Sequence, residues 1–224
     1  MTGSGVPRDG LTDRSYETLR ERILDGQLAP AERLQIDRLS KELGVSHTPV
    51  REALNRLVSE KLVTLEPYKG FRVTPLLDAE SLRQLLEARR VIELGALERS
   101  VRLATASDID EIRQVLAKLD GIAAAPELDI VSFNQLDAQF HRLTVVPCRN
   151  PYLIDSYDDL RVHVQIARYY RGRPAADSQQ AQAEHHAIVA ALEAGDRDAL
   201  ITAASRHIDT VSSRLAGDGS EVSA

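Results

Sequence analysis

Hydrophobic positions recur every three to four residues over most of the chain, which is the spacing of amphipathic α-helices. In the first third, this pattern predicts one helix that starts at Thr12 and stops at Gly26, and a short second helix that ends before Gly44. A third helix is expected to begin with Thr48 as its N-cap and Pro49 at its first position, where a missing N–H costs nothing.

The pattern changes after the third helix. The runs 62–65 and 71–74 are rich in β-branched and aromatic residues and are joined by the turn sequence PYKG, so we expect a β-hairpin. From about residue 78 to 215 the pattern is helical again and predicts six helices, so the fold is mainly α. The predicted divisions are a flexible tail at 1–11, a winged helix-turn-helix at 12–75, an antiparallel six-helix bundle at 76–216 and a second tail at 217–224.

Composition and charge narrow the class of protein. With 43% hydrophobic residues the chain can fold, and it contains no apolar run long enough to span a membrane, so no membrane partner is expected. The N-terminus lacks a secretion signal and Cys148 is the single cysteine, which together indicate a cytoplasmic protein. The net charge is −6, but residues 1–75 hold 12 Lys and Arg against 11 Asp and Glu, so the acidity belongs to the second domain.

The N-terminal domain has the layout of a DNA-binding module, with three helices, a glycine turn and a hairpin. On the third helix Arg51 and Asn55 lie one turn apart on the polar face, and the residues at its start, Ser46, His47 and Thr48, lie beside them. Arg can bind guanine, Asn can bind adenine, and hydroxyls at a helix N-terminus suit phosphate. A compact helical hairpin with a solvated polar face would show much of the same pattern.

The run "LGVSHTPVREAL", followed by a wing glycine, resembles the DNA-binding domain of the GntR family of bacterial transcription regulators. The resemblance implies contacts with operator DNA from Ser46, Thr48 and Arg51 on the recognition helix. It implies further contacts at the tip of the wing, where Lys69 and Gly70 stand.

Two positions depart from the usual family pattern. His47 stands where the family usually has Arg, and Asp37 stands at a position that is basic in part of the family, with Arg38 beside it as a candidate contact. A neutral imidazole cannot make the two-pronged contact of a guanidinium, so we expect a different operator sequence.

The C-terminal domain contains a set of polar residues on otherwise apolar helix faces. Asp137 and His141 are four residues apart, and the periodicity turns His185 and His207 into the bundle, whereas His186 falls on a solvated face. Each imidazole has two polar nitrogens to satisfy, and a core histidine with ordinary hydrogen bonds is the alternative to a ligand. Three histidines and one carboxylate suit zinc most of all, with nickel or manganese as alternatives.

This constellation resembles the FCD effector domain of the FadR-like subfamily, and the six predicted helices resemble its VanR-type branch. The resemblance implies that Asp137, His141, His185 and His207 hold a divalent metal. It also implies that an Arg of the first bundle helix, Arg89 or its neighbour Arg90, binds a small carboxylate effector.

One further histidine is a candidate effector contact. His163 could face the same cavity, although a single histidine in a bundle helix is more often part of the core.

The predicted function is a homodimeric regulator that binds a double-stranded DNA operator and responds to an organic acid, most simply a repressor that the acid releases. Two alternatives remain open. The metal site could be that of a hydrolase, because an open position on zinc can activate water. The metal could also be structural, or could itself be the signal.

Overall fold

The computed structural model describes residues 8–170 and 175–217, without the side chains of 8–9, 161–170, 175–177, 214 and 216–217. The chain divides into two compact units, Met1–Leu76 and Leu77–Ala224. This division lies one residue from the predicted boundary between the two domains. Most of the two expected tails falls outside the described residues.

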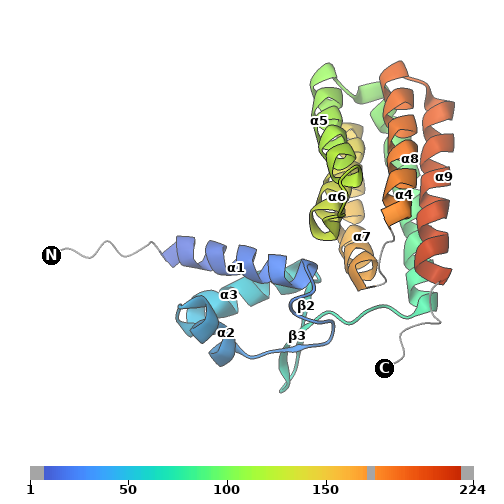
Figure 1. Ribbon diagram of the computed structural model, residues 1–224. Helices are drawn as coiled ribbons and strands as arrows, with labels where there is room; N and C mark the ends of the chain where they lie inside the picture. Colours follow the sequence, from blue (N-terminus) through green and yellow to red (C-terminus); the bar gives the residue numbers. More distant parts are fainter. Residues whose placement is uncertain (1–7, 171–174, 218–224) are drawn as a thin grey trace. The chain divides into compact units, whose positions relative to one another are not determined.

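Three helices and a small sheet form the N-terminal unit (Figure 1). The first helix begins at Arg8, four residues before the predicted start at Thr12, so part of the expected 1–11 tail is helical. Apolar periodicity does not mark this extra turn, so the sequence pattern predicted a later start. The elements are α1 (Arg8–Leu24), β1 (Arg33–Leu34), α2 (Ile36–Leu43), α3 (His47–Ser59), β2 (Val63–Glu66) and β3 (Gly70–Val73).

The turn between α2 and α3 sets the start of the third helix. Gly44 closes α2 with a φ of 66°, in the left-handed region that a residue with a Cβ rarely adopts. Ser46 follows in an extended conformation as the N-cap of α3, so the predicted cap at Thr48 is wrong by two residues. Pro49 is then the third helical residue, and its missing N–H is still one that the first turn leaves unsatisfied.

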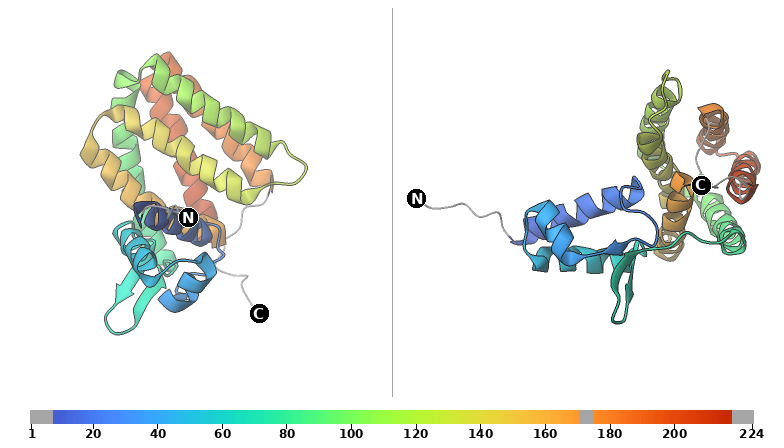
Figure 2. Two further views of the ribbon diagram at one scale, coloured as in Figure 1. Left: turned by 90° about the vertical axis from the view of Figure 1, so that its left-hand side faces the viewer. Right: turned by 60° about the horizontal axis from the view of Figure 1, so that its bottom comes forward.

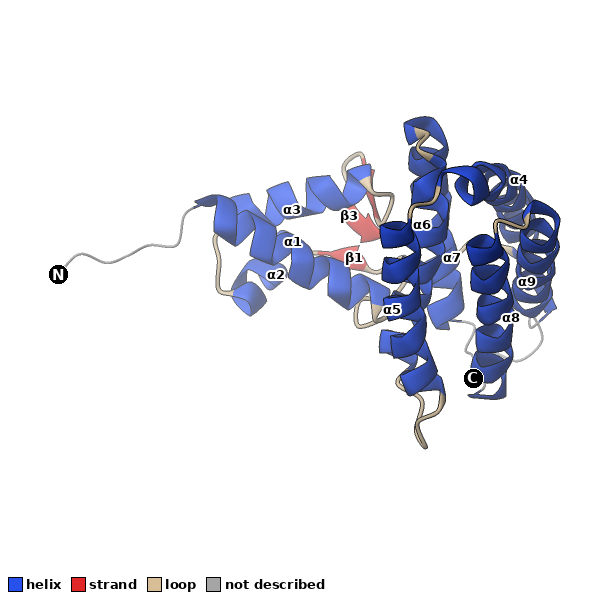
Figure 3. Ribbon diagram, turned by 90° about the horizontal axis from the view of Figure 1, so that it is seen from above, coloured by secondary structure: helices blue, strands red, loops and turns tan. Residues whose placement is uncertain are grey.

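The sheet has one more strand than predicted. Strands β2 and β3 form the expected hairpin, with bounds one residue away from the predicted runs and Leu65 opposite Phe71. Strand β1 pairs antiparallel with β3, with Arg33 opposite Arg72, which gives the strand order β1-β3-β2. A strand of two residues is too short to show an alternating pattern. Among the described residues, the strands lie in the N-terminal unit alone (Figure 3).

The described part of the C-terminal unit contains the six predicted α-helices and one short 3₁₀ helix. Consecutive helices alternate in direction, and α9 packs against both α4 and α8 (Figures 1 and 2). The elements are α4 (Ala79–Leu103), α5 (Ala106–Ala123), α6 (Ile130–Val145), η1 (Val146–Cys148), α7 (Pro151–Tyr170), α8 (Ala175–Ala194) and α9 (Arg197–Gly217).

An apolar core holds five of these helices together. Leu97 of α4, Leu119 of α5, Phe140 of α6, Leu192 of α8 and Leu200 of α9 belong to one cluster, and each is buried. Burial of such side chains stabilises a fold by about 1.5–3 kcal/mol each. None of the helices in residues 8–170 and 175–217 is long and apolar enough to cross a bilayer.

Candidate metal centre and DNA-contact surface

Three buried histidines from three helices of the C-terminal unit converge on one point. His141 lies on α6, His185 on α8 and His207 on α9, and each is at most 2% exposed. The Nε2 atoms of His141 and His207 are 3.0 Å apart. One ring nitrogen of each histidine lies within 4.8 Å of the other two. The structure therefore brings together the three histidines that the sequence predicts to face inward.

Asp137 borders the same point from α6. It is fully buried, and its place one turn before His141 puts both side chains on one face of the helix. Its Oδ2 lies 3.8 Å from Nε2 of His141, and its Oδ1 lies 3.6 Å from Nε2 of His185. The carboxylate thus faces two of the three histidines.

Carboxylates bind the outer nitrogens of two of these rings. Nδ1 of His141 lies 3.3 Å from Oε1 of Glu93, and Nδ1 of His207 lies 2.8 Å from Oε2 of Glu184. An ionised carboxylate only accepts hydrogen bonds, so each Nδ1 carries the proton and donates it. In the neutral rings each Nε2 atom then presents its lone pair, and these are the atoms that converge.

His185 follows the same pattern with an amide. Its Nδ1 lies 2.8 Å from Oε1 of Gln182, one turn earlier on α8. With Nδ1 as the donor, its Nε2 is also a lone pair directed at the shared point. Histidine ligands of metals are commonly oriented by such outer hydrogen bonds.

The donor set fits a divalent cation. Three imidazole lone pairs and a carboxylate oxygen directed at one buried point repel one another unless a positive charge lies between them. Three nitrogens and one oxygen are a donor set that zinc accepts, and nickel or manganese can also take it. His141, His185, His207 and Asp137 are therefore the residues that could hold a metal here.

A buried ion pair extends this network into α4. Nε of Arg89 donates to Oε2 of Glu93 at 2.7 Å, and both side chains are at most 3% exposed. The Arg89 guanidinium also lies over the ring of Tyr157, 6.0 Å from its centroid. Burial alone would raise the pKa of Glu93, but the charge of Arg89 and the hydrogen bonds from His141 and Arg89 outweigh it and hold that pKa well below its ordinary value. Glu93 is thus an anion between Arg89 and His141.

The structure distinguishes between the two candidate arginines of α4. Arg89 is buried beside the histidine set, whereas Arg90 is partly exposed and pairs with Asp209 of α9. The other candidate effector contact, His163, lies in the stretch of α7 whose side chains are outside the described residues. His186 is exposed, as predicted, with its Nε2 3.0 Å from Asp120.

Glu93, Gln182 and Tyr157 are parts of this centre that the sequence prediction missed. Glu93 carries a usable signal, because it stands four residues after Arg89 and both lie on the face of α4 that is otherwise buried. Tyr157 carries no such signal, since it reaches Arg89 only through the packing of α7 against α4. Gln182 stands one turn before His185 on the same helix, but its contact with that ring depends on its rotamer.

The expected DNA-contact residues of α3 are all exposed. Ser46, His47 and Thr48 lie at its N-terminus, and Arg51 and Asn55 follow on the polar face. Buried Val50, Leu54 and Leu57 anchor the opposite face in the core of the unit.

The two departures from the family pattern contact each other. Nε2 of His47 lies 3.2 Å from Oδ1 of Asp37, and both side chains are mostly exposed. Asp37 stands in the first turn of α2 and His47 is the first residue of α3, so this pair joins the starts of the two helices. A carboxylate therefore stands beside the imidazole on the expected DNA-contact surface.

Four of the expected residues line one hollow of about 510 Å³ between the start of α3 and the wing. They are His47, Arg51, Lys69 and Gly70, and Arg33 of β1 lines the same hollow. Ser46, Thr48 and Asn55 do not line it. The sequence prediction missed Arg33 because it missed β1.

Two of the expected basic contacts have acidic neighbours. Arg38 is held by Glu32, with an Nη2–Oε1 distance of 2.7 Å, and the hydrogen bond to Glu32 raises the pKa of Arg38. Lys69 at the wing tip lies 3.1 Å from Glu66. Gly70 beside it adopts a φ of 84°, which explains a glycine at this turn.

Both units match known protein families. Residues 11–73 match the family described as "Bacterial regulatory proteins, gntR family", and residues 84–210 match the FCD domain. The FCD match alone spans more than half of the chain.

Individual relatives agree with these matches. The chain is 29% identical to the HTH-type transcriptional regulator McbR of Escherichia coli K12, over 88% of this chain and 90% of McbR. A solved structure of E. coli McbR/YncC aligns with a TM-score of 0.78 and 26% identity, over 92% of this chain and 96% of that one. The gluconate operon transcriptional repressor of Bacillus licheniformis is 26% identical over 88% of this chain and 82% of its own length.

A third similarity concerns the C-terminal unit alone. The Zn²⁺-bound FCD domain of TM0439 aligns with a TM-score of 0.51 and 20% identity, over 62% of this chain and 94% of that one, which shows a shared fold. The relatives with named roles regulate transcription, so the hydrolase alternative is not favoured.

Proposed function

Because this chain belongs to the gntR family of bacterial regulatory proteins and carries an FCD domain, it is a transcription regulator, and we propose that it is a repressor released from its operator by a small carboxylate. The named role of the gluconate operon repressor supports this proposal.

The exposed start of α3 and the wing bind the operator. Arg51 reaches base edges, and the hydroxyls of Ser46 and Thr48, at the N-terminus of α3, suit phosphate. Asn55 and His47 are further candidates for base contacts. Support for this assignment comes from their exposure on one face of α3.

The wing and its surroundings supply the other contacts. Lys69 and Gly70 at the wing tip meet the DNA backbone, and Arg38 of α2 and Arg33 of β1 add positive charge beside them.

His141, His185, His207 and Asp137 hold the metal, with zinc as the first choice and nickel or manganese as alternatives. The converging Nε2 atoms are the observation that supports the metal most directly. When bound, the metal supplies a Lewis-acidic position to which a carboxylate oxygen can bind.

Arg89 is the cationic partner of the effector. It is buried beside the histidine set and already binds one carboxylate, that of Glu93. An effector carboxylate at this guanidinium therefore competes with Glu93, and Glu93 in turn orients His141. His163 of α7 is proposed as a second effector contact. Through these contacts an organic acid would change the positions of the helices that carry the histidines.

The regulator acts as a homodimer in the cytoplasm, where its operator is found. A single winged helix-turn-helix makes few base contacts, and two-fold proteins match palindromic operators. Effector binding changes the affinity for DNA by changing how well two DNA-binding units fit the spacing of two half-sites.

Operator binding in the presence of organic acids tests the proposal. Purified, metal-loaded protein is titrated into duplexes from the DNA that flanks its own gene, with and without a panel of hydroxy acids and dicarboxylates. At least one acid should weaken binding tenfold or more. If no acid changes the affinity but added or removed metal does, the metal is itself the signal.

A further inference from the structure

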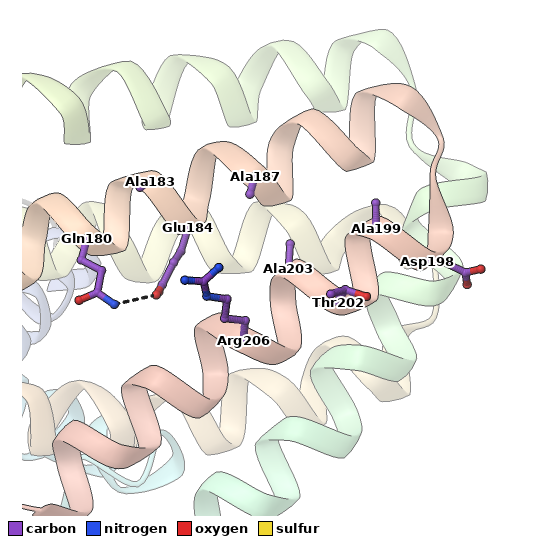
Figure 4. A pocket seen from close by; sticks show the side chains of 9 residues that line it. All are labelled: Gln180, Ala183, Glu184, Ala187, Asp198, Ala199, Thr202, Ala203 and Arg206. Carbon is purple, nitrogen blue, oxygen red and sulfur yellow. Dashed lines mark hydrogen bonds between the residues drawn. The ribbon is translucent and has the colours of Figure 1, made fainter.

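An apolar groove of about 620 Å³ runs along the outside of the C-terminal bundle between α8 and α9 (Figure 4). Alanines line both of its walls, with Ala183 and Ala187 on α8 and Ala199 and Ala203 on α9. Ala183, Ala187 and Ala199 are exposed to solvent. We call this feature the α8–α9 groove.

The alanine spacing makes each wall smooth. Both pairs are four residues apart, so the methyl groups of each pair lie one above the other along the helix. A second helix can approach such a wall closely, and an alanine loses no side-chain entropy when it is covered. The groove therefore has the shape and chemistry of a site for another helix.

The charges on α9 indicate which helix fits. Asp198 stands four residues before Thr202, Arg206 stands four residues after it, and all three line the groove. If two copies of α9 cross antiparallel at Thr202, Asp198 of each copy meets Arg206 of the other. This arrangement is self-complementary, as a two-fold interface requires. Asp198 also pairs with Arg197 but stays 87% exposed, and Arg206 makes no ion pair with the described residues.

We propose that the α8–α9 groove is the face through which two copies of this chain pair, with Thr202 near the two-fold axis. This inference rests on the homodimer of the proposed function and adds the surface that forms it. The partner is a second copy because the opposite charges are placed symmetrically about one residue of the same helix.

The floor of the groove connects this face to the histidine set. Glu184 lines the groove, and its Oε2 accepts the hydrogen bond from Nδ1 of His207. Its Oε1 accepts hydrogen bonds from Thr210 and from Gln180. Glu184 therefore links a helix seated in the groove to His207.

Cysteine cross-linking locates the axis. Thr202→Cys places a thiol at the proposed axis, and Gln114→Cys places one on an exposed position of α5 as the control. The native Cys148 is buried and stays in place. Under mild oxidation the full-length Thr202→Cys protein should run at twice the monomer mass on a non-reducing gel, because a disulfide needs Cα atoms within about 7 Å. The Gln114→Cys protein should stay monomeric on that gel. The opposite result is a dimer in light scattering for which Gln114→Cys cross-links and Thr202→Cys does not. That result overturns the α8–α9 groove as the dimer face and leaves the proposed function intact.

Charge reversal gives an independent readout. Asp198→Lys and Arg206→Glu should each raise the dissociation constant of the dimer about tenfold in sedimentation, because each puts like charges opposite one another twice. The double variant Asp198→Lys/Arg206→Glu should return to within about threefold of the wild type. If the double variant instead dissociates more readily than either single variant, the proposed pairing is overturned. A wild-type monomer that still binds its operator overturns both this pairing and the homodimer of the proposed function.

Discussion

The Nε2 atoms of His141 and His207 lie 3.0 Å apart, although the two residues come from α6 and α9 and are 66 positions apart in the chain. Each ring is turned this way by a carboxylate on its other nitrogen, Glu93 for His141 and Glu184 for His207. The hydrogen bonds on the outside of the site thus decide which atoms face its centre, and this orientation is the basis of the proposed metal site.

Removal of one histidine should abolish tight metal binding. His207→Ala is expected to lower the affinity for zinc at least 100-fold, because the site loses one of its three nitrogen donors. The substitution also leaves Glu184 without the imidazole that it binds. The measurement is competition with a chromophoric chelator on full-length protein. His186→Ala is the matched control, since His186 is exposed on α8 and lies outside the set. An equal loss in both variants would contradict the assignment of the ligands.

The outer carboxylate should also matter. Glu184→Ala is expected to lower metal affinity about 10- to 100-fold, as the loss of an outer hydrogen bond to a ligand does. The same chelator competition measures this effect. Glu193→Ala serves as control, because Glu193 is an exposed residue of the same helix that pairs with Arg113. Wild-type affinity in Glu184→Ala would show that His207 needs no such support.

Two neighbouring arginines should differ sharply in their effect on stability. Arg89→Met leaves the carboxylate of Glu93 buried without its cation and should lower the free energy of unfolding by about 3–5 kcal/mol. Arg90→Met removes a surface pair with Asp209 and should cost about 1 kcal/mol or less. Urea denaturation of both variants measures the difference. Similar small losses would mean that the Arg89–Glu93 pair contributes little.

Acid should weaken one contact at the start of α5. Burial alone would raise the pKa of Asp108, but hydrogen bonds from Thr105 and the charge of Arg149 hold it below its ordinary value. A carboxyl whose pKa is lowered in the folded state contributes stability above its ordinary pKa and loses it as the pH falls through the folded value.

This contribution can be isolated by substitution. The stability difference between wild type and Asp108→Asn should therefore be full at pH 7 and should shrink as the pH falls below about 4. Urea midpoints measured across this range give the result. Asp110→Asn, an exposed carboxylate of the same helix, should show little difference at any pH.

DNA binding should depend on Arg51 more than on bulk charge. Arg51→Ala should weaken operator binding by about 1–3 kcal/mol and relax base preference at one position, as the loss of a base contact does. Arg102→Ala removes the same charge from an exposed site on α4 and should leave binding nearly unchanged. Fluorescence anisotropy with operator duplexes measures both. A uniform loss over all DNA sequences would instead make Arg51 a phosphate contact.

The sequence alone predicted the helices and the inward-facing histidines, because both follow from a period of 3.6 residues. The four-residue spacing of Asp137 and His141 is such a pattern within a single helix. Glu93 and Gln182 were missed because their contacts to the histidines depend on how α4 packs against α6 and on a rotamer within α8. Strand β1 was missed for a related reason, since two residues become a strand only when β3 pairs with them.

The pairing of His47 with Asp37 shows the same limit. Each position was recognised in the sequence as a departure from the family pattern, but their contact depends on the angle between α2 and α3. Gly44 marks the turn in the sequence, but the angle between the helices also depends on packing in the core, which no single residue indicates.

The response of operator binding to an organic acid, compared between wild type and His207→Ala, tests the central claim most directly. Fluorescence anisotropy with the same operator duplex gives both affinities, with and without the acid that is active on the wild type. We expect the acid to weaken wild-type binding at least tenfold, and His207→Ala to bind the operator normally but to ignore the acid. A His207→Ala protein that still releases the operator in response to the acid would contradict the claim that the histidine site controls DNA binding.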